Sequence, residues 1–148
     1  MSEPISVEAL TADDYDEVVA LWQGCAGVGL NESDERQPLT AFLARNPGLS
    51  LVARRDGAVI GAVLCGHDGR RGYLHHLAVA ESHRGQGLGR AMVSRCLASL
   101  AVLGIPKCNV FVYADNDVGA GFWRAQGFAS RNDLLVLQCP TAEHAGSL

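Results

Sequence analysis

The stretch Arg84-Gly85-Gln86-Gly87-Leu88-Gly89 lies between a predicted β-strand over 73–79 and a long predicted helix over 88–103. A glycine-rich junction of this kind directs several backbone N–H groups into one concavity at the positive end of the helix dipole. Glycines matter there because a side chain would keep a phosphate away from the backbone. Arg90 follows the loop, and no Asp or Glu occurs from Gly85 to Ala114. The stretch therefore predicts a phosphate-binding loop, with a plain glycine-rich turn as the alternative.

Two common nucleotide-binding loops do not fit this stretch. A dinucleotide loop requires G-x-G-x-x-G and an acidic residue about 20 residues later. Counted from Gly85, the third glycine position holds Arg90, and the next acidic residue is Asp115. A P-loop requires Gly-Lys followed by Ser or Thr, which the sequence lacks. A nucleotide-binding oxidoreductase is therefore disfavoured.

Length and composition limit the class of protein. The chain has 148 residues, 48% hydrophobic and 19% charged, so we expect one domain over 1–148. Its net charge of −4 argues against general binding to a nucleic-acid backbone. No apolar run approaches the roughly 18 residues of a membrane span, and the opening Met-Ser-Glu-Pro lacks the features of a secretory signal. Five cysteines without a C-x-x-C pair and five histidines without metal-ligand spacing favour reduced thiols, a cytoplasmic location and no metal site.

Hydrophobic periodicity predicts alternating strands and helices. Strands are expected over 4–10, 49–54, 58–65, 73–79 and 107–114, with a last strand inside 128–138. Helices are expected over 11–24, 38–45, 88–103 and 117–126, and 27–37 is expected to be a loop. The Asp-Gly pair at 56–57 is a strong hairpin signal. The order β-α-α-β-β-β-α-β-α-β indicates an α/β fold whose mixed central sheet is antiparallel first and has crossovers later.

The sequence resembles the GNAT superfamily of N-acetyltransferases, and among them bacterial enzymes of the RimI-like kind. The family signature Gln/Arg-x-x-Gly-x-Gly/Ala matches Arg84 to Gly89. Asn116 to Phe128 resembles the later family motif that ends in Gly-Phe, and Leu77-Ala78-Val79 resembles the family's central strand. Because the order of elements also agrees, the resemblance covers almost the whole chain. It implies a GNAT fold with splayed central strands, and acetyl-CoA as the acyl donor.

The resemblance also implies which residues hold the donor. The loop amides of Arg84, Gly85, Gln86, Gly87, Leu88 and Gly89, followed by Arg90, would bind the pyrophosphate. The pantetheine arm would lie in a V-shaped gap between the strands over 73–79 and 107–114. Exposed amides in the stretch Leu77, Ala78 and Val79 would bond this arm and polarise the thioester carbonyl. Asn116 would bond the pantetheine, and an Asx turn with a helix cap is the alternative or additional role of this residue.

Candidate acid–base residues lie on the strand over 73–79. Two-residue alternation places Tyr73 and His75 on one face, and Leu74 and His76 on the other. The arrangement resembles the paired histidines of the arylalkylamine branch of the family, with Tyr73 in place of one histidine. We expect His75 to be the general base, because the ordinary histidine pKa of about 6.5 suits that task. A structural strand histidine is the alternative for His75, and His76 is expected in the core or in an interface.

The sequence lacks the tyrosine that usually serves as general acid in this family. Trp123 stands where the family usually has a proton-donating tyrosine, and an indole N–H cannot usefully release a proton. Tyr113 is the alternative donor, and a thiol with a pKa of about 8.5 also allows CoA to leave as a thiolate. Packing in the helix core is the other interpretation of Trp123. Glu81 and Asp115 are minor candidates that cap a turn or face solvent.

The acceptor site is expected near the first two helices and the loop over 27–37. This loop contains Glu32, Asp34 and Glu35, which attract a cationic amine in one interpretation and simply face solvent in the other. We expect direct transfer of acetyl from acetyl-CoA to a primary amine in a ternary complex, the amine belonging to a small molecule, a protein N-terminus or a lysine. The alternative is an acyl-CoA-binding sensor without efficient turnover, and the resemblance leaves a homodimer open.

Overall fold

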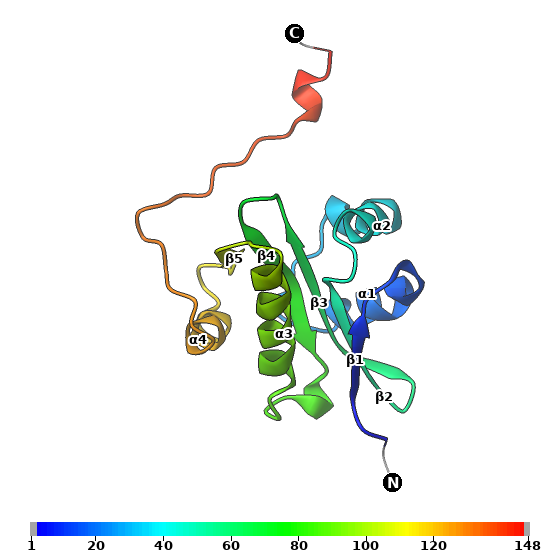
Figure 1. Ribbon diagram of the computed structural model, residues 1–148. Helices are drawn as coiled ribbons and strands as arrows, with labels where there is room; N and C mark the ends of the chain where they lie inside the picture. Colours follow the sequence, from blue (N-terminus) through cyan, green and yellow to red (C-terminus); the bar gives the residue numbers. More distant parts are fainter. Residues whose placement is uncertain (1–2, 147–148) are drawn as a thin grey trace.

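The computed structural model describes residues 3–146, so the ends of the expected domain, 1–2 and 147–148, lie outside the described residues. In chain order the strands and α-helices are β1 (Ser6–Ala9), α1 (Tyr15–Gln23), α2 (Arg36–Arg45), β2 (Leu51–Arg55), β3 (Ala58–His67), β4 (Gly72–Val79), α3 (Leu88–Val102), β5 (Cys108–Val110) and α4 (Asp117–Ala125) (Figure 1). Short 3-10 helices lie at η1 (Ala12–Asp14), η2 (Glu32–Asp34), η3 (Glu81–His83) and η4 (Ala142–His144).

The strands form one mixed sheet in the order β1-β2-β3-β4-β5. Pairing is antiparallel from β1 to β4, and β4 and β5 run parallel. Helices α1 and α2 cover one face of the sheet, and α3 and α4 cover the other (Figure 1). The α/β fold with a mixed central sheet that the sequence predicted is therefore confirmed.

Each face of the sheet has its own hydrophobic cluster. On the α3 face, Met92 of α3 packs with Val63 of β3, and both are fully buried. On the opposite face, Trp22 of α1 and Leu39 of α2 pack with Ala62 of β3. Because β3 is covered on both faces, it is buried from residue 60 to 66, and its sequence is a continuous run of apolar and small residues.

β4 contains one more residue than the stretch of β3 that it faces. The pairing includes Leu64 with His75 and Ala62 with Ala78, so two residues of β4 lie opposite one residue of β3. His76, inside this β-bulge, has a positive φ of 54°. A bulge shifts the side-chain alternation of the strand by one residue.

The bulge places both histidines of β4 on the same face of the sheet. The ring of His75 meets the ring of Phe42 on α2, with 6.2 Å between centroids, and the ring of His76 meets that of Trp22 on α1 at 5.1 Å. The prediction that His76 lies on the face opposite His75 is therefore wrong, because it assumed an uninterrupted two-residue repeat.

Two expected strands also differ from the structure. The strand expected over 107–114 is shorter, since β5 ends at Val110 where its pairing with β4 ends. The last strand expected inside 128–138 is not formed. This segment leads away from the sheet (Figure 1), and side chains such as Leu135 and Leu137 are 86% and 88% exposed. An apolar run forms a strand only where a neighbouring strand accepts its hydrogen bonds.

We expect Gly66→Ala to lower the free energy of unfolding by about 1–3 kcal/mol, the usual cost of overpacking. A Cβ at Gly66 would lie 2.7 Å from Phe42 Cζ and 2.8 Å from Asn46 Nδ2. Asn46 is buried, and its Oδ1 accepts the N–H of His67, so this neighbour cannot move freely. Urea unfolding at fixed pH measures the change.

Gly121→Ala is the matched control for this substitution. Gly121 lies inside α4, and no atom lies within 4 Å of a Cβ built there. Helix propensity alone should then raise the free energy of unfolding by about 0.5–1 kcal/mol. A Gly66→Ala protein as stable as the wild type would contradict the tight contact between β3 and α2.

Candidate active site

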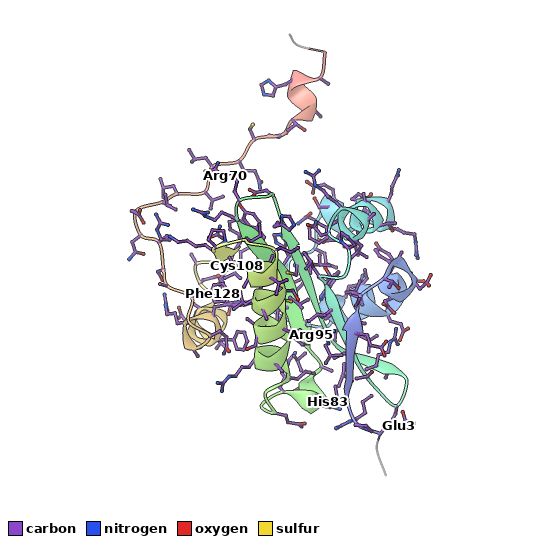
Figure 2. The ribbon with its side chains drawn as sticks, in the orientation of Figure 1. Glu3, Arg70, His83, Arg95, Cys108 and Phe128 are labelled. Carbon is purple, nitrogen blue, oxygen red and sulfur yellow. The ribbon has the colours of Figure 1, made fainter. Side chains whose placement is uncertain are left out.

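A cleft of about 2880 Å³ follows the gap between β4 and β5. The two strands pair only over Gly72–Leu74 and Cys108–Val110, and Cys108, labelled in Figure 2, marks the closed end of the gap. Beyond this short ladder β4 continues alongside β3 to Val79, whereas the chain after β5 leaves the sheet. The splayed central strands predicted from the sequence are thus present, and their open edge borders the cleft.

The backbone of β4 presents hydrogen-bond donors to this cleft. The N–H of Ala80 donates to Ile60 O on β3 at 2.8 Å. Because N–H directions alternate along a strand, the N–H groups of Val79 and Leu77 point to the opposite edge, into the gap. By the same rule the N–H of Ala78 points to β3, and its side chain is buried on the α1/α2 face. The free amides are therefore those of Leu77 and Val79, whereas Ala78 supplies packing.

The glycine-rich loop between η3 and α3 forms a second group of donors. Gly85 and Gly87 have φ angles of 76° and 83°, which glycine adopts without strain. Within residues 3–146, no backbone carbonyl accepts the N–H groups from Gly85 to Arg90. Helix α3 begins directly after Gly87 and runs for 15 residues, so its dipole adds positive potential there. All the predicted loop residues except Gln86 line the cleft.

The guanidinium of Arg84 is bonded within the protein. Its Nε donates to Val79 O at 2.9 Å, and its Nη2 donates to Cys25 Sγ at 3.6 Å. Arg84 therefore connects the end of β4 with the chain that follows α1. The arginine in the first turn of α3, Arg90, also lines the cleft and adds positive charge beside the loop.

His75 lies among aromatic rings at the cleft. Its ring stacks with those of Tyr73 and Phe111, with 6.2 and 6.3 Å between centroids. Burial lowers the pKa of His75 below its ordinary value of about 6.5, and the neighbouring His76 lowers it further, whereas Asp34 acts in the opposite direction. His75 is therefore neutral at neutral pH and can accept a proton. Tyr73 and His75 share one face, as the sequence predicted.

His76 reaches the same cleft through a contact that the sequence did not reveal. Its Nε2 lies 3.0 and 2.9 Å from the two carboxylate oxygens of Asp34. Asp34 belongs to η2 and is only 7% exposed. The signal was present in the spacing of Leu74 and Leu77, which both pack on the α3 face although they are three positions apart, an odd spacing. Such a spacing requires a bulge between them.

The chain between β5 and α4 closes against the loop that follows α1. Oδ1 of Asn116 accepts the N–H of Gly119 at 2.9 Å, so Asn116 caps α4, as the helix-cap interpretation predicted. A Cβ at Gly27 would lie 2.9 Å from Asn116 Nδ2, and a Cβ at Gly29 would overlap the hydroxyl of Tyr113. Asn116 and Tyr113 both line the cleft, on the side of the loop over 27–37.

Trp123 is half-buried: it packs against the hydrophobic cluster on the α3 face and also lines the cleft. Its ring meets those of Phe122 and Phe128 edge to face, with 5.2 and 5.1 Å between centroids, against the hydrophobic cluster on the α3 face. Phe128, labelled in Figure 2, follows α4 directly. Glu81 and Asp115 are exposed and do not line the cleft. The indole N–H of Trp123 can donate a hydrogen bond but cannot usefully release a proton, and the two carboxylates lie outside the cleft, so none of these three side chains is placed to act as an acid there.

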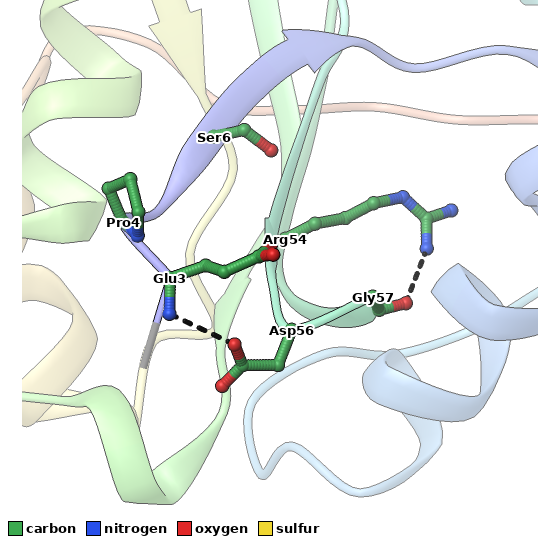
Figure 3. Close-up of a pocket in the computed structure, with 6 residues that line it drawn as sticks. All are labelled: Glu3, Pro4, Ser6, Arg54, Asp56 and Gly57. Carbon is green, nitrogen blue, oxygen red and sulfur yellow. Dashed lines mark hydrogen bonds between the residues drawn. The ribbon is translucent and has the colours of Figure 1, made fainter. Parts of the chain in front are cut away.

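A smaller hollow of about 560 Å³ lies at the hairpin between β2 and β3 (Figure 3). Its polar groups bond one another, since the N–H of Glu3 donates to Asp56 Oδ1 at 3.0 Å and Arg54 Nη1 donates to Gly57 O at 3.1 Å. Among the described residues that line it, this hollow therefore has no row of unbonded backbone N–H groups like that of the glycine-rich loop. The cleft between β4 and β5 is therefore the better candidate for chemistry.

The described residues contain neither a metal-binding cluster nor a membrane-spanning helix. No three or more His, Cys, Asp or Glu side chains in residues 3–146 are placed to hold a metal ion. No helix in that range is long and apolar enough to cross a membrane. All five cysteines are free.

Comparison with known proteins agrees with this geometry. Residues 15–128 match the model of the Acetyltransferase (GNAT) family. An acetyltransferase of Sodalis glossinidius (strain morsitans) is 31% identical over 133 residues, which cover 90% of this chain and 93% of the relative. An acetyltransferase of Pectobacterium atrosepticum is 32% identical over 119 residues, which cover 80% of this chain and 84% of the relative.

Solved structures share the fold at lower identity. The PaiA N-acetyltransferase from Thermoplasma acidophilum, in complex with coenzyme A, has a TM-score of 0.77 and 18% identity, with 87% of this chain and 92% of that chain covered. The ribosomal-protein-alanine N-acetyltransferase from Brucella melitensis biovar Abortus 2308 has a TM-score of 0.71 and 19% identity, with coverage of 93% and 100%. The GNAT fold that the resemblance implied is confirmed, and the chain belongs to the GNAT acetyltransferase family.

Proposed function

We propose that this protein transfers an acetyl group from acetyl-CoA to a primary amine by direct attack in a ternary complex. The observation that carries the proposal is the row of free backbone donors along the cleft, from Gly85–Arg90 at the loop to Val79 and Leu77 on β4. Family membership supports the donor, because GNAT acetyltransferases use acetyl-CoA, and the similar PaiA enzyme was solved with coenzyme A.

The cleft suits acetyl-CoA at both of its polar parts. The N–H groups of the glycine-rich loop, together with Arg90, would hold the pyrophosphate at the N-terminus of α3. A Cβ at Gly85 or Gly87 would stand in open space, so an anion has room to approach the backbone there. The amides of the pantetheine arm would then pair with Leu77 and Val79, as an added strand pairs with an open sheet edge.

Three further residues would support the donor. Asn116 uses its Oδ1 to cap α4, so its Nδ2 is the group available to the pantetheine arm. Arg84 would act through its bonds to Val79 O and Cys25 Sγ, because these bonds fix the end of β4 beside the loop. Ala78 would contribute by packing beneath the arm.

The chemistry follows from the groups at the cleft. The amine nitrogen attacks the thioester carbon, a C–N bond forms, and the carbonyl electron pair moves to oxygen, where the N–H of Leu77 or Val79 would stabilise it. His75, neutral and exposed to the cleft, would accept the proton that this nitrogen loses, with Tyr73 stacked on its ring. When the C–S bond breaks, the Tyr113 hydroxyl would protonate the departing thiolate.

The acceptor amine belongs to a small molecule, a protein N-terminus or a lysine side chain. The loop over 27–37 and the rings of Phe42 and Phe111 form the cleft wall on that side. We place the reaction in the cytoplasm, where five free cysteines would stay reduced.

One observation favours a second candidate function. Trp123 is packed between two phenylalanine rings at the position of the family's usual proton donor. A protein that binds acetyl-CoA but lacks an efficient acid would act as an acyl-CoA sensor. Such a sensor would bind acetyl-CoA and release no CoA with any amine.

We expect Gly87→Asp to weaken acetyl-CoA binding by more than about 100-fold, because like charges placed together cost several kcal/mol. The new carboxylate would lie among donors meant for phosphate, at a residue whose φ is 83°. Isothermal titration calorimetry measures the change, with NAD as a ligand that should not bind.

Gly69→Asp is the matched control. Gly69 also has a positive φ, 89°, and open space around a Cβ, but it lies in the turn between β3 and β4, outside the cleft. This variant should bind acetyl-CoA like the wild type. Unchanged affinity in Gly87→Asp would refute the phosphate site, and a folded wild type that binds no acetyl-CoA would refute the proposed function.

We expect His75→Ala to lower kcat by about 10²-fold or more, the usual contribution of a general base. The substrates are acetyl-CoA and a panel of alkylamines, arylalkylamines and short peptides, and the readout is thiol release. Because the pKa of His75 is lowered, its base form persists to more acidic pH than for an ordinary histidine. Wild-type activity should therefore fall only below about pH 6.5, and the variant should lose part of this pH dependence.

His67→Ala is the control, since His67 lies at the end of β3 and does not line the cleft. An unchanged rate and pH profile in His75→Ala would remove His75 as the base. No thiol release with any amine, despite acetyl-CoA binding, would favour the sensor.

A further inference from the structure

We infer that His76 and Asp34 form a proton-accepting pair that deprotonates the ammonium group of the acceptor before it attacks. The inference rests on the proposed function and deepens it, because it specifies a cationic primary amine as the acceptor. Neither residue belongs to the donor-binding groups described above. Both line the acceptor side of the cleft.

The carboxylate of Asp34 is held in place by several bonds. Its Oδ2 accepts the N–H of Asn31 at 3.0 Å and lies 2.9 Å from His76 Nε2, while its Oδ1 lies 3.0 Å from the same nitrogen. Its backbone oxygen accepts the hydroxyl of Tyr15 at 2.8 Å. With 7% of its surface exposed, Asp34 cannot turn freely toward water. The carboxylate is therefore aimed at the imidazole.

This contact decides which nitrogen of His76 can act as a base. An ionised carboxylate only accepts hydrogen bonds, so Nε2 of His76 must carry the proton and Nδ1 keeps its lone pair. Within residues 3–146, Nδ1 makes no protein hydrogen bond, and the only fully buried side-chain nitrogen or oxygen without a partner is Trp22 Nε1. Nδ1 is therefore accessible to solvent, on a residue that lines the cleft, and has no protein partner that would keep it from accepting a proton.

The surroundings distinguish His76 from its neighbour. His75 lies between apolar rings, and no carboxylate bonds to it, so its protonated form has little local support. Protonated His76 would instead form an ion pair with Asp34. The bulge in β4 is what places both imidazoles on the acceptor face, one beside the other.

The other ionisable groups near the pair come from four elements. His75 and Tyr73 lie on β4, Tyr15 on α1 and Arg36 on α2. Glu32 on η2 and Glu35 directly after it flank Asp34, and both are exposed. The guanidinium of Arg36 lies over the ring of Tyr15 and bonds Asp16 at 2.6 Å. Among the described residues, His76 is the only side chain that forms an ion pair with Asp34.

The proton count requires two acceptors, which two histidines can provide. A primary ammonium has no lone pair, so one proton must leave before attack, and His76 Nδ1 would take it while Asp34 stabilises the imidazolium. The neutral nitrogen then forms the C–N bond, and the second proton passes to His75. The C–S bond breaks, the thiolate takes a proton from the Tyr113 hydroxyl, one of the two imidazolium protons restores that hydroxyl, and the other reaches solvent. The products are an amide and CoA.

Asp34→Asn tests the pair with little change in shape. The asparagine oxygen can still accept the N–H of Asn31, but its amide N–H₂ would donate to His76 Nε2 and force the proton to Nδ1. The lone pair would then face away from the cleft. We expect kcat/KM to fall about 10²–10⁴-fold, with an unchanged affinity for acetyl-CoA. Asp13→Asn, which removes an exposed carboxylate on η1, is the matched control and should behave like the wild type.

A second amine substrate distinguishes a catalytic role of Asp34 from a purely structural role in which Asp34 only anchors its loop. The best small alkylamine of the panel is compared with its β,β-difluoro analogue, which is largely neutral at the assay pH. If the pair removes a proton, the neutral analogue should recover most of the rate that Asp34→Asn loses. An equal loss with both amines, or a rate within threefold of the wild type, would mean that Asp34 only anchors the loop, and would overturn the inference.

Nitrogen-15 NMR of labelled histidine shows which ring nitrogen of His76 carries the proton, and it needs no acceptor substrate. In the free wild-type protein, His76 should be protonated on Nε2 in its neutral form, and Asp34→Asn should switch the proton to Nδ1. A proton on Nδ1 in the wild type, or an imidazolium throughout the assay range, would overturn the inference while acetyl transfer stands. If the protein binds acetyl-CoA but acetylates no amine, the proposed function fails and the inference fails with it, whatever the NMR result.

Discussion

The extra residue in β4 is the constraint on which the site depends. Before the bulge, Leu74 packs on the α3 face; after it, Leu77 and Val79 pack on that same face. An uninterrupted strand would turn Leu77 and Val79 toward α1 and would point their N–H groups at β3. The shift of one residue therefore does two things together. It frees these amides at the cleft, and it moves His76 onto the acceptor face.

The bulge also has a conformational cost that neighbouring contacts offset. A non-glycine residue in the left-handed region costs about 1–3 kcal/mol, and His76 has a φ of 54°. The bond to Asp34 and the ring contact with Trp22 act on this same side chain. A hydrogen bond to a charged group contributes about 1.5–3 kcal/mol. The strained residue is thus held by groups from α1 and η2, two elements that also shape the acceptor side.

The local structure on the side of the cleft proposed for the donor could be predicted from sequence, because it is made of local backbone. The loop from Gly85 to Gly89, the start of α3 and the cap at Asn116 each depend on residues a few positions apart. The acceptor side depends on contacts between distant segments, such as Asp34 with His76, 42 residues apart. The same limit explains the last expected strand: its apolar residues 134–137 were visible, but whether another strand pairs with them is a property of the whole fold.

This difference suggests why acceptor choice can change in such a fold while the donor stays the same. Backbone amides are supplied by any sequence that keeps the glycines and the bulge, so the proposed donor site depends little on side chains. Asp34 and His76 are side chains on separate elements, and one replacement would change the charge on the side of the cleft proposed for the acceptor. Because their bond also joins η2 to β4, a change in the loop that carries Asp34 would reach the strand whose amides we propose for the thioester. In the proposed mechanism, acceptor chemistry and thioester position are therefore coupled through a single hydrogen-bonded pair.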